Sequence, residues 1–127
     1  MRTVSAILLA LALAGCATTN PQSPGTEMAV FDDIPAAPGM TYESGYGYRN
    51  PSGDLRTYNQ TFTGSRRSED VRRFYEEAFP VHGWKLMAAE GTGRVTLTFE
   101  KRAERCKITI EPSGNILKVT VIVGGRN

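Results

Sequence analysis

The sequence predicts an α+β domain: a curved antiparallel sheet in the order strand-strand-helix-strand-strand-strand-strand, with one amphipathic helix packed across one face. Three observations support this prediction. Six stretches alternate apolar and polar residues, the pattern of strands with one buried face. One stretch has apolar residues at helical spacing. Short turns separate the strands, which favours antiparallel neighbours, and the two apolar surfaces bury each other by packing together.

The first two strands are expected at residues 41–49 and 55–63. Residues 50–54 read Asn-Pro-Ser-Gly-Asp, a composition typical of turns, so the two strands should form a hairpin. The hairpin carries an unusual number of tyrosines at even positions: Tyr42, Tyr46, Tyr48 and Tyr58.

The helix is expected to begin at Ser68, whose hydroxyl can cap free backbone amides, and to end at Pro80 and Gly83. Its apolar residues form one stripe that must lie against the sheet: Val71, Phe74, Tyr75, Ala78 and Phe79. Nearby basic residues either form a solvated helix surface or contact an anionic partner, and we favour the solvated surface: Arg66, Arg67, Arg72 and Arg73.

The last four strands are expected at 84–89, 94–101, 106–110 and 116–123, because each stretch alternates apolar with polar residues. Turn-forming residues separate these stretches. They should therefore form an antiparallel meander.

The N-terminus resembles a lipoprotein signal peptide. Arg2 supplies a positive start, and the apolar run that follows is too short to span a bilayer. Leu13-Ala14-Gly15-Cys16 resembles a bacterial lipobox. The resemblance implies that residues 1–15 are removed and that Cys16 carries diacylglyceryl and often an N-acyl chain such as palmitate, enough to hold a protein on a membrane. Ala17, in place of Asp, favours the outer membrane.

The domain organisation follows from composition. Residues 16–39 are expected to form the lipidated N-terminus and a flexible tether, because residues 18–26 are polar and rich in proline and show no apolar periodicity. Within the tether, Phe31 and Ile34 could dock on the folded part. A single domain is expected at 40–125.

Several short motifs resemble a family of uncharacterised bacterial lipoproteins. They are Phe-Asp-Asp-Ile-Pro at 31–35, Pro-Gly-Met at 38–40, Phe-Tyr at 74–75 with Pro80, and Gly-Trp at 83–84. The family has no assigned reaction. The layout also resembles helix-grip domains, including those of a lipoprotein component of the outer-membrane barrel assembly machinery, a likeness of architecture and not of function.

The sequence contains no recognisable catalytic or metal-binding set. Loss of residues 1–15 leaves 14 basic and 13 acidic side chains, a balance that argues against nucleic acid as a partner. His82 is the single histidine, and a turn role is favoured over that of a hydrolase base. Cys106 has no second cysteine once Cys16 is lipidated, and it is expected to be a buried apolar residue. We therefore expect no enzyme activity, no metal and no cofactor.

Two binding functions remain. The first is a protein-interaction or accessory role in the cell envelope, on the outer membrane facing the periplasm, with the four hairpin tyrosines as the partner surface. The second is a small-ligand or lipid-binding module, with an apolar slot between helix and sheet near Phe74, Trp84 and Phe99. The sequence leaves the partner and the oligomeric state open.

Overall fold

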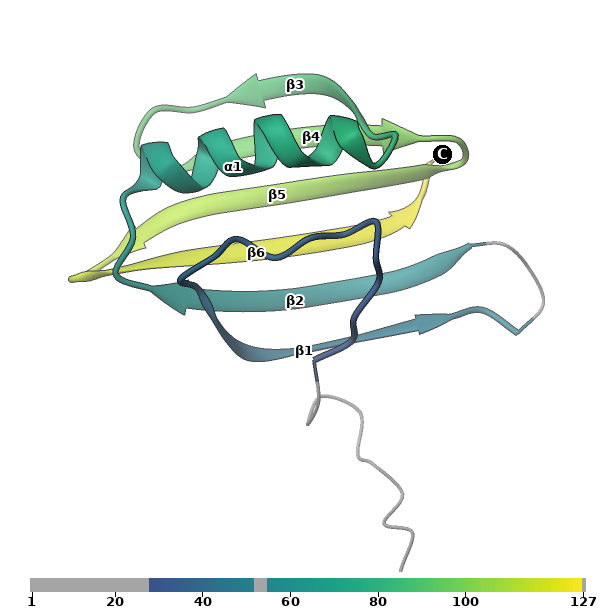
Figure 1. Ribbon diagram of the computed structural model, residues 1–127, viewed down its shortest axis with the longest axis horizontal. Coiled ribbons are helices and arrows are strands. Elements are labelled where there is room, and N and C mark those ends of the chain that lie inside the picture. Colours follow the sequence, from purple (N-terminus) through teal and green to yellow (C-terminus); the bar gives the residue numbers. More distant parts are fainter. Residues whose placement is uncertain (1–27, 52–54, 127) are drawn as a thin grey trace, which may run out of the picture.

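The structure is a computed structural model that describes residues 28–51 and 55–126. The expected signal peptide at 1–15, the lipidation site Cys16 and the tether up to residue 27 lie outside the described residues. The described chain forms one curved six-stranded sheet with a helix and an extended segment on the same face (Figure 1).

All strand pairs are antiparallel, and the order across the sheet is β1-β2-β6-β5-β4-β3. The predicted α+β class and element order are confirmed. The elements are β1 (Thr41–Arg49), β2 (Arg56–Gly64), α1 (Ser68–Val81), β3 (Lys85–Glu90), β4 (Val95–Lys101), β5 (Glu104–Ser113) and β6 (Ile116–Gly125).

The core lies between the sheet and its covered face. Alternate residues of the central strands point to this face and are buried, as the apolar alternation predicts. They include Leu97 and Phe99 from β4, Ile108 and Ile110 from β5, and Leu117, Val119, Val121 and Val123 from β6. Cys106 belongs to the same set and is fully buried.

The helix α1 covers the half of the sheet formed by β3, β4 and β5 (Figure 1). Val71, Tyr75 and Phe79 of its predicted stripe are buried. The predicted cap is wrong: Arg67 is the N-cap residue and Ser68 the first helical residue, without a side-chain capping bond. The helix reaches Val81, one residue past Pro80, and its last turn closes through the amides of His82 and Trp84, which both donate to the Phe79 carbonyl.

The other half of the covered face carries residues 28–40, here called the strap. In Figure 1 the strap runs across β2 and β6 on the same side as α1. Ile34 and Ala37 are only 6% and 3% exposed. The expectation of a flexible tether up to residue 39 does not fit residues 28–39, because apolar strap side chains cover sheet residues that α1 does not reach. The expected docking of Phe31 and Ile34 agrees with this arrangement.

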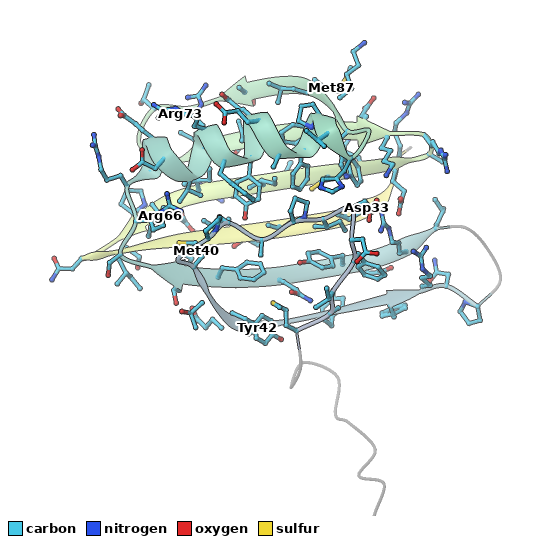
Figure 2. The ribbon with its side chains drawn as sticks, in the orientation of Figure 1. Asp33, Met40, Tyr42, Arg66, Arg73 and Met87 are labelled. Carbon is cyan, nitrogen blue, oxygen red and sulfur yellow. The ribbon has the colours of Figure 1, made fainter. Side chains whose placement is uncertain are left out.

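Specific contacts hold the strap in place. The Trp84 indole nitrogen donates a 2.7 Å hydrogen bond to the Asp33 carbonyl, and the Gln60 amide donates to the Ala29 carbonyl at 3.1 Å. Gly47 in β1 makes room for the strap, since a Cβ there would lie 2.6 Å from the Ala29 Cβ. Figure 2 shows Asp33 and Met40 at opposite ends of the crossing.

Candidate functional site

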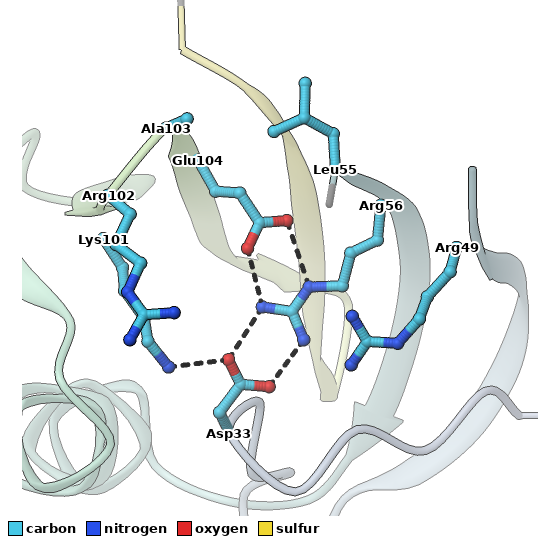
Figure 3. A pocket seen from close by; sticks show the side chains of 8 residues that line it. All are labelled: Asp33, Arg49, Leu55, Arg56, Lys101, Arg102, Ala103 and Glu104. Carbon is cyan, nitrogen blue, oxygen red and sulfur yellow. Dashed lines mark hydrogen bonds and ion pairs between the residues drawn. The ribbon is translucent and has the colours of Figure 1, made fainter. Parts of the chain in front are cut away.

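A charged pocket of about 650 Å³ opens at one end of the sheet, where the end of β1, the start of β2 and the β4–β5 hairpin meet the strap (Figure 3). Its lining is mostly polar and carries both signs of charge. The residues are Asp33, Arg49, Leu55, Arg56, Lys101, Arg102, Ala103 and Glu104.

Arg56 is the centre of the pocket floor. Its side chain is only 3% exposed, and two carboxylates satisfy its guanidinium group. Asp33 accepts hydrogen bonds of 2.6 and 2.7 Å, and Glu104 accepts two of 3.0 Å. Lys101 donates a further bond of 2.9 Å to Asp33. Paired, bidentate bonds of this kind offset the cost of burying a guanidinium ion.

The network fixes the charge states of its members. The hydrogen bonds from Arg56 hold the pKa of the Asp33 carboxyl well below its usual range; burial opposes this shift, and Lys101 reinforces it. The same hydrogen bonds, which Asp33 accepts, raise the pKa of Arg56 above its ordinary value. Both groups therefore stay ionised throughout the physiological range of pH.

Aromatic rings brace the cations of the pocket. The guanidinium carbons of Arg56 and Arg49 lie 5.0 and 5.3 Å from the ring centre of Phe31 in the strap. The Lys101 ammonium lies 5.6 Å from the ring centre of Trp84. Such contacts favour a cation over a ring face. The strap thus contributes both an anion and an aromatic wall to the pocket.

Arg102 occupies an unusual backbone conformation at the rim. It is the first residue of the two-residue loop that joins β4 to β5, between the paired residues Lys101 and Glu104. Its φ is 55°, and it is the one non-glycine residue with positive φ in 28–51 and 55–126. This conformation costs a non-glycine residue on the order of 1 kcal/mol.

The pocket presents charged groups that are largely paired with one another. Its two carboxylates are engaged with cations, and neither His82 nor Cys106 lines it. Burial raises the pKa of the Cys106 thiol, which disfavours the reactive thiolate. No group of three metal-ligating side chains occurs in the described part of the chain. Nor does that part contain a helix long and apolar enough to cross a membrane.

The four hairpin tyrosines do not form one surface. Tyr58 is buried, and its hydroxyl bonds to the Gln60 side chain at 3.1 Å. Tyr42 packs on Phe62 at the covered face, with ring centres 6.1 Å apart. Tyr46 and Tyr48 are 42% and 53% exposed. The predicted surface is therefore reduced to Tyr46 and Tyr48.

The predicted apolar slot between helix and sheet is filled. The ring of Phe79 occupies this space, with its centre 5.8 Å from that of Trp84 and 4.9 Å from that of Phe99. Both of these residues are buried core residues, and Phe74 lies at the edge of the core, partly buried. The three predicted slot residues are thus packing residues in this structure.

The charged pocket was not predicted from the sequence, although one signal for it was available. Arg56 shares its parity in β2 with Tyr58, Gln60 and Phe62, all of which face the core. An arginine on the buried side of a strand requires a carboxylate partner. The same alternation that predicted the strand could therefore have predicted an ion pair, though not its partners.

Comparison with known proteins places the fold. No curated protein and no solved structure matches the chain significantly. The family model described as START domain-like matches residues 47–120, which include the strands β2 to β5, the helix and most of the pocket residues. Because this match spans more than half of the sequence, the chain belongs to the START domain-like family.

Proposed function

We propose that this chain is a lipid-anchored binding protein of the bacterial cell envelope, whose domain binds a small polar ligand in the charged pocket. In this proposal Cys16 carries the lipid and holds the domain on the outer membrane, facing the periplasm. The domain acts by binding and not by catalysis. Membership of the START domain-like family supports a ligand-binding module.

The charged pocket is the observation that carries the proposal. It is about 650 Å³ in volume, within the usual range for small-molecule sites. The apolar core offers no comparable place at the expected slot, because Phe79 fills it. A ligand of this domain is therefore polar or has a polar group that enters the pocket.

The anchor is tested by substituting each cysteine in turn. In its native host, Cys16→Ala should abolish labelling by radioactive palmitate and leave the protein either with its signal peptide uncut or released from the membrane fraction, because the thiol is the attachment point. Cys106→Ala is the matched control and should keep both label and membrane location. A Cys16→Ala protein that remains labelled and membrane-bound would refute the anchor.

Binding is tested by nuclear magnetic resonance on the ¹⁵N-labelled full-length protein in neutral detergent. A panel of sugars, amino acids and phosphate esters is added one at a time. At least one should shift the amide signals of pocket residues such as Arg49, Arg56 and Glu104 in a saturable way, without shifting those of α1. If none of the panel shifts them, the proposed pocket function fails.

A second candidate function is protein interaction through Tyr46 and Tyr48. Their rings stack with centres 6.4 Å apart on the edge strand β1, and both are exposed. Tyrosine is enriched in interfaces. A photo-crosslinking amino acid at position 48 should capture an envelope protein, whereas the same group at Met87, which is 50% exposed on the opposite edge strand, should not. Equal capture at both positions would reject this surface.

A further inference from the structure

We propose that the ligand of the charged pocket carries a phosphate monoester group, held by Arg49, Lys101 and Arg102. This inference rests on the proposed function, because it names the chemical class of ligand for the same pocket. Neighbouring side chains already use the carboxylates and Arg56, while the remaining cations keep free donors.

The hydrogen bonds of the pocket leave donors free but engage the acceptors. Both oxygens of Asp33 and both oxygens of Glu104 accept bonds, and all three nitrogens of the Arg56 guanidinium donate to them. Lys101 makes one bond, to Asp33, and an ammonium has three hydrogens to donate. The carboxylates that a cationic ligand would need already accept hydrogen bonds from pocket side chains. An anionic ligand, in contrast, would meet donors that are still free.

Arg49 and Arg102 provide most of these free donors. Neither guanidinium group forms a side-chain hydrogen bond or ion pair with the residues of 28–51 and 55–126, and that of Arg49 lies over the face of the Phe31 ring. Figure 3 shows Arg102 beside Lys101 on one side of the Asp33–Arg56 pair and Arg49 on the other side. A group bound between them would meet guanidinium or ammonium donors from two directions.

The charge of the pocket selects a dianion. Among the described residues, four cationic side chains and two carboxylates line it, so this part of the lining carries a net charge of two positive units. A phosphate monoester carries about −1.5 to −2 at pH 7 and presents three acceptor oxygens. A single carboxylate would leave a positive excess. Guanidinium groups suit phosphate because they donate two parallel hydrogen bonds to it.

The surroundings of the hairpin extend the positive field. A second hollow of about 500 Å³ shares Lys101 and Arg102 with the pocket and adds Lys85 and Arg126 to its lining, against Glu100 as the one acidic member of that lining. Clustered positive charge raises the local concentration of anions and speeds their approach. The unusual backbone of Arg102 fits this role, because glycine would suit the loop better and would supply no charge.

The test titrates the full-length protein in neutral detergent with inorganic phosphate at pH 7 and at constant ionic strength. Saturable amide shifts are expected at Arg49 and at residues 101–104. Arg49→Gln and Arg102→Gln should each weaken the apparent affinity by about tenfold or more. Arg94→Gln removes the same charge from an exposed arginine at the opposite end of β4, and should weaken affinity by less than about twofold.

The source of the phosphate group is distinguished by two further probes, glycerol 3-phosphate and vesicles of phosphatidylcholine with phosphatidic acid. The vesicle arm uses the mature chain, residues 16–127, with Cys16→Ala, so that neither the protein's own lipid nor the apolar signal peptide binds the vesicle. Sensitivity of glycerol phosphate binding to Arg102→Gln supports a soluble phosphate ester. Sensitivity of vesicle flotation to the same change supports a lipid headgroup.

Three outcomes would overturn the inference. If a neutral sugar or an amino acid shifts the pocket amides and phosphate does not, the phosphate class is wrong, while the pocket keeps its binding function. If no probe shifts them, both proposals fall. If Arg94→Gln weakens phosphate binding as much as Arg102→Gln does, the anion is attracted by general surface charge and the pocket is not its site.

Discussion

Removal of the Arg56 charge is the sharpest test of the buried network. Arg56→Met keeps a long side chain and its packing against the core, but leaves Asp33 and Glu104 without their shared cation. Truncating one partner of a buried ion pair typically costs about 3–5 kcal/mol. The carboxylates of Asp33 and Glu104 are 24% and 13% exposed, so water partly compensates them. We therefore expect a loss near the lower end, about 3 kcal/mol.

Urea denaturation at several pH values measures this loss and its cause. The bonds from Arg56 hold the Asp33 pKa low in the folded state. The stability from this ion pair is therefore fully present above the unfolded pKa of about 3.9 and is lost as pH falls through the lower folded value. The variant should be less stable than the wild type by a constant amount between about pH 5 and 7, and the two curves should begin to converge below about pH 4.

A second substitution separates charge from packing. Adding Asp33→Asn and Glu104→Gln to Arg56→Met removes the uncompensated carboxylates and should recover most of the lost stability at pH 7. Replacing a whole buried ionic set by neutral groups is often close to neutral in free energy. A deficit below about 1 kcal/mol in the single variant, or a deficit that is the same at pH 3 and pH 7, would refute the electrostatic account.

Three further predictions concern the glycines, the rim and the core. Gly47→Ala should cost about 1–3 kcal/mol in thermal unfolding, since its Cβ would lie 2.6 Å from the strap, whereas Gly124→Ala meets nothing within 4 Å and should be nearly neutral. Arg102→Gly should leave the free energy of unfolding in urea unchanged or raise it by up to about 1 kcal/mol, and it should weaken phosphate binding. A clear loss of stability would mean that the Arg102 side chain stabilises the loop. Phe79→Ala should lower the free energy of unfolding by about 3–5 kcal/mol. Phe74 is only partly buried, so Phe74→Ala should lower it by clearly less. Equal melting temperatures of the two variants would contradict the packing described.

The regular elements could be predicted from the sequence because burial produced the patterns. Ile108 and Ile110 alternate with polar residues since one face of β5 is covered, and Val71, Tyr75 and Phe79 repeat at helical spacing since one side of α1 packs on the sheet. Such patterns identify which side chains face inward. They carry no information on the space between those side chains, so a slot was expected where the Phe79 ring lies.

The hairpin tyrosines do not share one face of the sheet, although their even spacing in the sequence predicts that they should. Tyr42, Tyr46 and Tyr48 stand at even positions and should share a face. The pairing of β1 with β2 shifts register between Tyr42 and Ser44, which is the mark of a β-bulge. One extra residue reverses the facing of everything after it. Tyr42 therefore turns inward, while Tyr46 and Tyr48 turn to the other face, and no alternation in the sequence marks the shift.

The strap could not be predicted because its order depends on distant partners. Asp33 meets Arg56 and Lys101, far along the chain, and Trp84 donates to its carbonyl. Read locally, the strap contains Pro35 and Pro38 and no regular alternation of apolar and polar residues, features shared by loose linkers and by extended chains that dock. Prolines fix an extended backbone in both cases. Long-range contacts decide between the two, and a single sequence does not display them.

The pairing of β2 with β6 has a consequence for how the chain is completed. The opening hairpin finds its neighbour in the closing strand, as the register from Tyr58–Val123 to Gly64–Leu117 shows. Until the ribosome has synthesised β6, β2 has no partner strand on that side, and the sheet is incomplete. At about 5–20 residues per second, synthesis of the residues from β2 to β6 takes seconds. A chain with this topology completes its sheet only late in synthesis. This order of events suits any chain that must pass unfolded through a narrow channel before it folds.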